Sequence, residues 1–330
     1  MIGHRPCVVG LGELVWDLLP DGDLPGGAPA NFAFHAAQLG GEGVVVSAVG
    51  KDPAGMALCD WLHAAGVDHD SVQSIDRATG KVSVSLSSSG QPEFVIHENA
   101  AWDYLAWNKP LEALAARTDC VCVGSLAQRS PLSRKIIRRF LLATSPGCLR
   151  IFDVNLRPPY VSPRVIAETV KLANIVKLNE DEWPFVAEHL HLSNEWSAGL
   201  REMVDKYQLR LVALTRGAGG SVLVDKDGIH EAPSQQVQVV DTIGAGDAFA
   251  AAMAIGLLHS VPISRLHRNA AAVARFVCTQ PGATPVLPGA LVHEVISAES
   301  KPPESAKLLL TQFPKVFGTL CRGSPASAIS

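Results

Sequence analysis

Short apolar runs rich in Val, Ile and Leu recur along the chain and alternate with stretches of helical period. The apolar runs are Cys7–Leu11, Val44–Ala48, Cys120–Val123, Leu149–Val154, Ile175–Leu178 and Leu211–Leu214. The helical stretches between them are Ala30–Gln38, Met56–Ala65, Pro131–Leu142, Pro163–Leu172 and Glu195–Tyr207. Strands that are apolar along their whole length and alternate with helices indicate a parallel sheet covered on both faces. The pattern predicts a doubly wound α/β sandwich.

Two regions depart from this rhythm. Polar and apolar positions alternate over residues 13–19 and, around a Ser88–Ser89–Gly90 turn, over residues 81–98. Such alternation is typical of half-exposed antiparallel strands, so we expect a small β lid over the sheet. Farther along, three short runs within residues 209–232 predict an antiparallel meander that completes the sheet.

After Pro288 the composition shifts towards Ser, Pro and Lys. We therefore expect one α/β domain over residues 1–288, with the lid inserted in it, and a C-terminal extension over residues 289–330. The extension is expected to be partly helical and then flexible.

Composition and charge exclude several classes of function. The 330 residues include 28 Lys and Arg against 32 Asp and Glu, a formal net charge of −4, which disfavours binding to nucleic acid. The longest continuous apolar stretch, Ala248–Leu258, has 11 residues, whereas a membrane span needs about 20. The seven cysteines form no CxxC pair, which favours reduced thiols. We expect a cytoplasmic protein without membrane association.

Two common phosphate-binding motifs are missing. Both Gly-Lys pairs lack the upstream glycine and the following Ser or Thr of the P-loop. The dinucleotide fingerprint GxGxxG fails because Val15 stands where the third glycine would follow Gly10-Leu11-Gly12. P-loop nucleotidases and NAD-dependent dehydrogenases are therefore disfavoured.

The segment Asp241-Thr242-Ile243-Gly244-Ala245-Gly246-Asp247 runs directly into a helical stretch that ends at Leu258. Its Gly-Ala-Gly backbone can approach an anion closely at a helix N-terminus, where the helix dipole favours negative charge. Asp247 at the same place can act as general base for a hydroxyl that attacks a phosphoryl group. The other interpretation of Asp247 is an ordinary helix N-cap.

This segment resembles the C-terminal signature of the ribokinase/fructokinase superfamily, the PfkB-type carbohydrate kinases. Gly26-Gly27-Ala28-Pro29-Ala30-Asn31-Phe32-Ala33, about 215 residues earlier, resembles the N-terminal signature. The resemblance extends from about Val8 to about Pro288. It implies a ribokinase-like three-layer α/β/α sandwich with a mostly parallel central sheet and a small β-sheet lid.

The resemblance also implies roles at the reacting end of the site. Asp247 would deprotonate a sugar hydroxyl, and an anion hole would stabilise charge on the transferring γ-phosphoryl group of ATP. The anion hole would consist of Gly244, Ala245 and Gly246. The implied sugar-binding residues are Asp17, Gly26, Gly27, Asn31 and Arg157, although a solvated salt bridge is an alternative for Arg157.

Loops after the later strands resemble the family's nucleotide- and metal-binding segments. The implied nucleotide-binding residues are Asn179, Thr215, Gly217, Gly220 and Asn269. Glu182 would hold Mg²⁺ through water, although a helix N-terminus enriched in acidic residues also accounts for residues 179–182. Asp241, with the loop Gln280–Thr284, would hold a monovalent cation such as K⁺.

The expected activity is that of an ATP- and Mg²⁺-dependent sugar kinase. Fructose is the first choice of substrate, because the lysine that follows the paired glycines in ribokinases is missing after Gly26-Gly27. Ribose, a keto-deoxy sugar acid and a nucleoside are alternatives, and so is a catalytically silent sugar sensor. The lid lacks the arginine that fructokinases carry after a Phe-x-Phe pattern, since Phe94-Val95-Ile96-His97 contains none. A homodimer through the lid is also expected.

Overall fold

The computed structural model describes residues 5–19, 22–86 and 92–297. Within them, a nine-stranded sheet has the order β13-β12-β11-β10-β9-β8-β1-β4-β5. Its strands are β1 (Cys7–Leu11), β4 (Glu42–Gly50), β5 (Val72–Ile75), β8 (Cys120–Val123), β9 (Leu149–Asp153), β10 (Ile175–Asn179), β11 (Leu211–Thr215), β12 (Ser221–Asp225) and β13 (Gly228–Ala232). The strands from β5 to β11 pair in parallel, and β12 and β13 add an antiparallel end. The predicted parallel core and antiparallel meander are confirmed.

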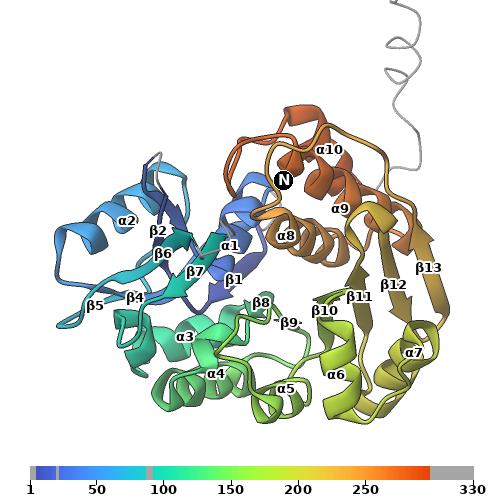
Figure 1. The fold of residues 1–330 in the computed structure, drawn as a ribbon, viewed down its shortest axis with the longest axis horizontal. Helices are drawn as coiled ribbons and strands as arrows, with labels where there is room; N and C mark the ends of the chain where they lie inside the picture. The colour runs from blue at the N-terminus through green and yellow to red at the C-terminus, as the bar shows by residue number, and fades with distance from the viewer. Residues whose placement is uncertain (1–4, 20–21, 87–91, 298–330) are drawn as a thin grey trace, which may run out of the picture. The chain divides into compact units, whose positions relative to one another are not determined.

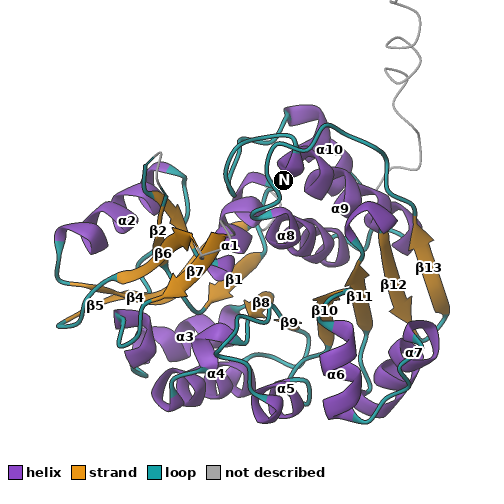
Figure 2. Cartoon of the chain, in the orientation of Figure 1, coloured by secondary structure: helices purple, strands orange, loops and turns teal. Residues whose placement is uncertain are grey.

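Helices cover both faces of this sheet (Figures 1 and 2). One face carries α1 (Ala28–Gln38), α8 (Ala245–Leu258), α9 (Ile263–Cys278) and α10 (Gly289–Ile296). The other carries α3 (Lys109–Arg117), α4 (Pro131–Ala143), α5 (Pro163–Thr169), α6 (Trp183–Leu190) and α7 (Trp196–Tyr207). Successive strand residues face opposite layers, so Val8 packs with α1 and α8 while Val9 packs with α3 and α4. The three-layer sandwich is confirmed.

Local chemistry decides where two helices begin. α2 (Pro53–Ala64) starts at Pro53 and not at Met56, because the Asp52 carboxylate accepts the Gly55 amide at 2.8 Å as an N-cap. α8 starts at Ala245, with Gly244 as its N-cap. The interpretation of Asp247 as the N-cap is therefore wrong, since Asp247 lies inside the first turn.

A second sheet, of order β3-β2-β6-β7, lies beside α2 (Figure 1). Its strands are β2 (Val15–Leu18), β3 (Leu24–Gly26), β6 (Gly80–Leu86) and β7 (Pro92–Ile96). β6 and β7 are antiparallel as predicted, but β2 and β6 pair in parallel, so the expectation of an all-antiparallel lid is wrong. The chain passes through α1, β4, α2 and β5 between β2 and β6, which is long enough for a parallel crossover. The predicted Ser88–Ser89–Gly90 turn lies outside the described residues.

α10 follows Pro288 and packs on α8 and α9, with Val295 buried. The domain boundary at 288 remains a prediction. Across the part of the chain that the structure describes, no helix is long and apolar enough to cross a membrane. The six cysteines in that part are free thiols.

Candidate active site

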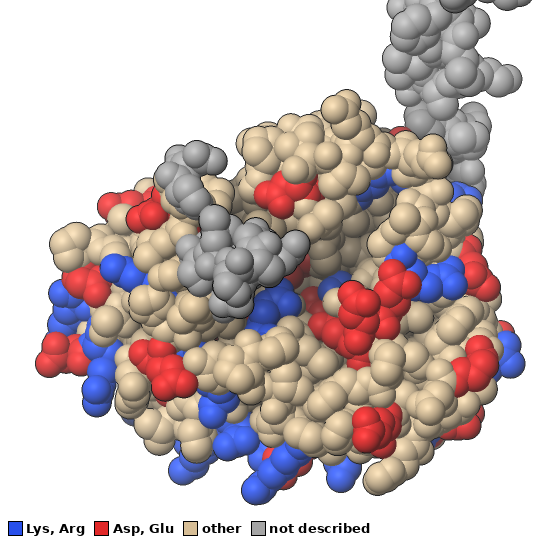
Figure 3. Space-filling view, viewed as in Figure 1, with Lys and Arg blue, Asp and Glu red and all other residues tan. Residues whose placement is uncertain are grey.

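The two glycine-rich segments meet at the carboxyl ends of the parallel strands, where open α/β sheets bind their ligands. The side-chain amide of Asn31, one turn into α1, donates through Nδ2 to Asp247 Oδ2 at 2.9 Å. Figure 3 shows a hollow near the middle of this face, with acidic side chains gathered where Figure 1 places β10 and β11. The fold thus joins the predicted sugar-binding and catalytic segments.

Asp247 is half-buried in the first turn of α8. Burial raises the pKa of its carboxyl to about 7, and the charge of Asp153 adds to the rise, while the Asn31 hydrogen bond opposes it. A carboxyl with a pKa near the operating pH can accept a proton and release it again. The position and titration of Asp247 both suit a general base.

The loop before α8 is built to bring backbone close to a ligand. Gly244 has φ +77°, and a Cβ atom there would lie 2.5 Å from the Ala283 carbonyl oxygen. A Cβ atom on Gly246 would lie 3.1 Å from the Lys177 Nζ. Only glycine fits Gly244. The N–H groups of Gly244 and Gly246 lie at the N-terminal end of α8, where an anion can bind, while the Ala245 N–H donates to the Thr242 carbonyl oxygen at 3.3 Å.

The paired glycines of the N-terminal signature lie between two acidic residues. A Cβ atom on Gly26 would lie 2.5 Å from Asp17 Oδ2, and one on Gly27 would lie 2.4 Å from the Glu13 carbonyl oxygen. Asp17 is half-buried, and burial raises the pKa of its carboxyl. Asp17 thus lies against Gly26, Gly27 lies against the Glu13 backbone, and Asn31 bonds to Asp247.

Glu13 is a site residue that the sequence analysis did not assign. Only 3% of Glu13 is exposed, and its Oε2 has no hydrogen-bond partner. Burial raises the pKa of this carboxyl to about 7, and the charge of Asp247 contributes to the rise. The signal in the sequence was an acidic residue two positions after the apolar run Cys7–Leu11, just beyond the end of a strand.

Two arginines reach this region from the strands β8 and β9. Arg157 is exposed, and its positive charge lowers the pKa values of Glu13, Asp17 and Asp247. Arg129 is buried: its guanidinium stacks on Trp102 at 4.0 Å and donates to the His97 carbonyl, at the end of β7, at 2.6 Å. A guanidinium therefore holds the end of the lid although the lid strand itself contributes no arginine.

Lys177 and Asp153 form a buried ion pair next to the Gly246 backbone, which the sequence analysis also did not assign. Lys177 Nζ donates to both carboxylate oxygens of Asp153, at 2.9 and 2.8 Å. The signal was a lysine inside the apolar run Ile175–Leu178.

Asn179 and Glu182 are locked to each other at the end of β10. The Asn179 amide donates to Glu182 Oε2 and the Glu182 amide donates to Asn179 Oδ1, both at 2.9 Å. Glu182 Oε1 accepts the Leu156 amide at 2.8 Å. Glu182 is also the N-cap position of α6, which agrees with the interpretation of residues 179–182 as a helix N-terminus, and the role of Glu182 towards Mg²⁺ stays a prediction.

Thr215 ends β11 directly beside Asn179, with which it is in register. The loop that follows turns at Gly217, with φ +48°, and at Gly220, with φ +85°. A Cβ atom on Gly220 would lie 2.2 Å from the Ala232 carbonyl oxygen, so this turn requires glycine. The residues predicted to bind the nucleotide therefore lie together at the carboxyl ends of β10 and β11 and in the loop that follows: Asn179, Thr215, Gly217 and Gly220.

Two predicted residues bind other parts of the chain. Asp241 accepts the Ile243 amide at 3.0 Å and the Gly282 amide at 3.1 Å, which joins it to the predicted cation loop Gln280–Thr284. The side-chain amide of Asn269, on α9, donates to the backbone carbonyl oxygen of Glu294, on α10, at 2.6 Å. Asn269 therefore ties two helices together, and its nucleotide contact remains a prediction.

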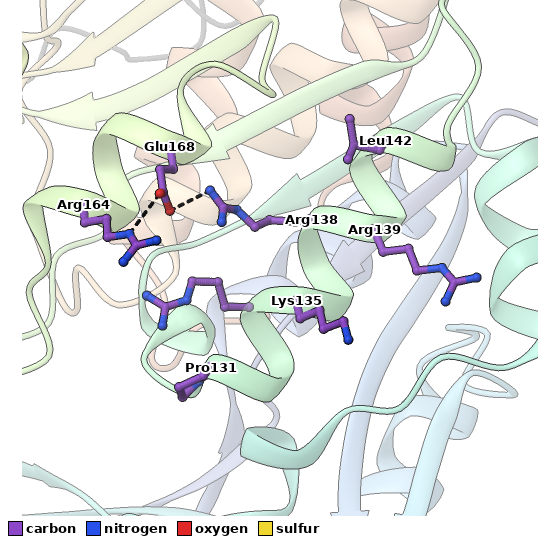
Figure 4. A pocket seen from close by; sticks show the side chains of 8 residues that line it. Pro131, Lys135, Arg138, Arg139, Leu142, Arg164 and Glu168 are labelled. Carbon is purple, nitrogen blue, oxygen red and sulfur yellow. Dashed lines mark hydrogen bonds and ion pairs between the residues drawn. The ribbon is translucent and has the colours of Figure 1, made fainter.

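A separate hollow of about 380 Å³ on α4 and α5 is lined mainly by basic residues (Figure 4). Arg138 and Arg164 both face Glu168, at 2.6 and 2.9 Å, whereas Arg139 points away from it. None of the predicted site residues lines this hollow. Among the described residues, no group of three or more His, Cys, Asp or Glu is arranged to hold a metal ion.

A half-buried carboxylate beside a glycine-rich helix N-terminus, at the carboxyl ends of parallel strands, is the arrangement expected of a phosphotransferase that acts on an alcohol group. The family model described as pfkB family carbohydrate kinase matches residues 23–290. The chain belongs to this family and is a sugar kinase.

Named relatives agree with this class. The fructokinase of Salmonella typhimurium is 31% identical over 263 residues, which cover 76% of this chain and 83% of that protein. The uncharacterized sugar kinase PH1459 of Pyrococcus horikoshii, solved in complex with ATP, has 28% identity and a TM-score of 0.74 over 87% of this chain and 99% of that chain. The fructokinase of Vibrio cholerae O395, solved in a fructose, ADP and calcium ion bound form, has 26% identity and a TM-score of 0.71 over 89% and 99%.

Proposed function

We propose that this protein is an ATP-dependent fructokinase. The observation that supports the proposal is the hydrogen bond between Asn31 and Asp247, because it joins the segment that we propose to bind the sugar to the carboxylate that we propose as the base. The similarity to fructokinases of Salmonella and Vibrio supports fructose as the acceptor.

The reaction follows from this arrangement. The sugar hydroxyl oxygen attacks the γ-phosphorus of ATP, its proton passes to an Asp247 carboxylate oxygen, and the bond from phosphorus to the bridging oxygen of ADP breaks. The N–H groups of Gly244, Ala245 and Gly246 stabilise the charge on the transferring group. The products are a sugar phosphate and ADP, and Asp247 returns its proton to solvent.

The charges near the site favour a neutral sugar over a sugar acid. Glu13, Asp17 and Asp247 are carboxyl groups gathered around one region, and Arg157 is the exposed cation near them. Carboxylates accept hydrogen bonds from hydroxyl groups and repel another carboxylate. Fructose fits this surface better than a keto-deoxy sugar acid; ribose and a nucleoside remain as neutral alternatives.

The metal sites are proposals of the same kind. Glu182 uses one lone pair on each oxygen for backbone amides, which leaves others to hold Mg²⁺ through water. Asp241, bonded to the loop Gln280–Thr284, fits a site for K⁺ built from backbone carbonyls. Bound Mg²⁺ supplies positive charge that neutralises the phosphates of ATP.

Two further proposals concern the state of the protein in the cell. The exposed side chains of Leu24 and Val95 on the lid sheet support the expected homodimer through the lid. A cytoplasmic location is expected for a kinase that uses ATP.

A coupled assay of ADP release over a panel of fructose, ribose, 2-keto-3-deoxygluconate and nucleosides tests the proposed function. We expect turnover with fructose above all other sugars, and a loss of about 10³-fold in kcat for Asp247→Asn. Arg117→Gln, at an exposed ion pair with Glu42, serves as the control and should leave the rate unchanged. A wild-type protein that binds sugar but phosphorylates none would instead be the silent sensor.

A further inference from the structure

The ion pair between Asp153 and Lys177 lies near the carboxyl ends of two inner strands of the nine-stranded sheet. The two residues are directly opposite each other on the parallel strands β9 and β10. Each side chain is 7% exposed, so both charges are removed from water. Their side chains belong to the same face of the sheet as Ile151 and Ile175, which pack with α8.

This placement brings the ammonium group to the anion-hole loop. Lys177 Nζ lies 3.1 Å from the point that a Cβ atom on Gly246 would occupy, so it contacts the loop from the side of the sheet. The next residue along α8 is Asp247. The pair is therefore close to both parts of the phosphoryl-transfer site, the N–H groups and the base.

Stability alone does not account for such a pair. Two buried charges lose their hydration, and well-packed apolar residues in the same place are often as stabilising or more so. What apolar residues do not supply is charge next to Asp247. The charged groups that act on Asp247 from the surrounding elements are Asp153, Lys177, Arg157 and Glu13. The Cys122 thiol also faces it but is uncharged, because burial raises the pKa of this thiol well above its usual value.

We propose that Asp153 and Lys177 are a positioning pair for the kinase reaction, which supports the Gly246 loop and sets the charge state of Asp247. The inference rests on the proposed function. Lys177 keeps Asp247 ionised enough to accept a proton, and it neutralises Asp153, so that the γ-phosphoryl group meets one free carboxylate and not two. The two members act on Asp247 with opposite sign, since Asp153 raises its pKa and Lys177 lowers it.

Opposite signs give a sharp test with Asp153→Asn, Lys177→Met and the double variant. We expect the acid limb of the pH profile of kcat/KM to move down by about one unit in Asp153→Asn and up by about one unit in Lys177→Met. The double variant should fold with a Tm close to that of the wild type, show an acid limb between the two, and lose at least about tenfold in kcat. Arg117→Met, which breaks the exposed pair with Glu42, is the matched control.

A second readout does not depend on catalysis. The ¹³C carboxyl resonance of Asp247, assigned through Asp247→Asn, reports its titration directly in each variant. Shifts of opposite sign in the two single variants support the proposal even if the sugar is misassigned. A double variant with wild-type kcat and unmoved titration, or single variants that move in the same direction, would overturn it. Failure of the wild type to phosphorylate any sugar would overturn the proposed function instead.

Discussion

The two sides of the candidate site differ in whether side chains or backbone groups face the ligand. On the side that we propose to bind the sugar, side chains carry the charge: Glu13, Asp17 and Asp247 are carboxyl groups removed to different degrees from water. On the side that we propose to bind the nucleotide, backbone geometry dominates, with turns at Gly217 and Gly220 that only glycine adopts easily. Side chains there, such as Glu182, are occupied by main-chain amides.

This difference follows from the ligands that each side is proposed to hold. A sugar is neutral and presents hydroxyl groups, which buried carboxylates recognise and one of which must lose a proton. A nucleotide brings its own negative charge, for which N–H groups at turns and helix N-termini are suited. Substitutions on the two sides should therefore have separable effects, on the sugar or on ATP.

Gly244→Ala should have the largest effect of the substitutions that follow from this comparison, because Gly244 belongs to the proposed anion hole between the two sides. A methyl group at φ +77° would meet the Ala283 carbonyl and displace the loop. We expect kcat to fall by about 100-fold. Steady-state kinetics with both substrates saturating measures this. The control Gly147→Ala, at a position with open space around it, should be unaffected.

Asp17→Asn should affect the sugar side alone. The carboxylate lies against the Gly26 backbone and is half-buried. An uncharged amide in its place would form weaker hydrogen bonds with the sugar hydroxyl groups than the charged carboxylate forms. We expect KM for the sugar to rise by about 10- to 100-fold while KM for ATP stays constant. An equal rise in both KM values would show that the two sides are not separable.

Gly220→Ala should affect the nucleotide side alone. A Cβ atom there would meet the Ala232 carbonyl, which forces the loop after β11 to shift. We expect KM for ATP to rise by about fivefold with KM for the sugar unchanged. Isothermal titration with a non-hydrolysable ATP analogue gives the same comparison without turnover, and unchanged affinity would contradict a nucleotide role for this loop.

The pH dependence gives the smallest effect at neutral pH, about a twofold loss at pH 7, and it concerns the carboxyl groups next to the sugar. Because burial raises the pKa of Asp247 to about 7, the ionised form that accepts a proton is lost as the pH falls through that value. We expect kcat/KM for the sugar to be at half its plateau near pH 7 and to fall about tenfold for each further unit. A flat profile down to pH 5 would show that Asp247 does not titrate in this range.

The sequence predicted the central architecture because its strands are apolar throughout and its two signatures are long. It did not predict β5, an edge strand with half-buried side chains, or α3 and α6, which have 9 and 8 residues and show too few turns for a clear period. Parallel pairing of β2 and β6 also escaped it, because alternation along a strand does not reveal the direction of its partner.

The sequence predicted those site residues that belong to a recognisable motif. It did not assign the buried charged residues outside the motifs to the site. Asp247 and Asn31 stand in the two signatures, and the structure joins them. Glu13 and Lys177 are single charged residues next to or inside apolar runs, and only the fold shows that they face Asp247 and Gly246. A single charged residue in an apolar run can be assigned to a site only when the topology shows which residues lie next to it.

The bond between Asn31 and Asp247 joins residues 216 positions apart, so the order of synthesis matters for this site. The sugar-binding segment leaves the ribosome early, whereas α8 emerges only when most of the chain has been made. An unfinished chain that ends before residue 244 contains the loop after β11 that we propose to bind the nucleotide, but neither the proposed anion hole nor the proposed base. In the proposed mechanism, phosphoryl transfer is therefore withheld until the late-synthesised α8 has docked against α1.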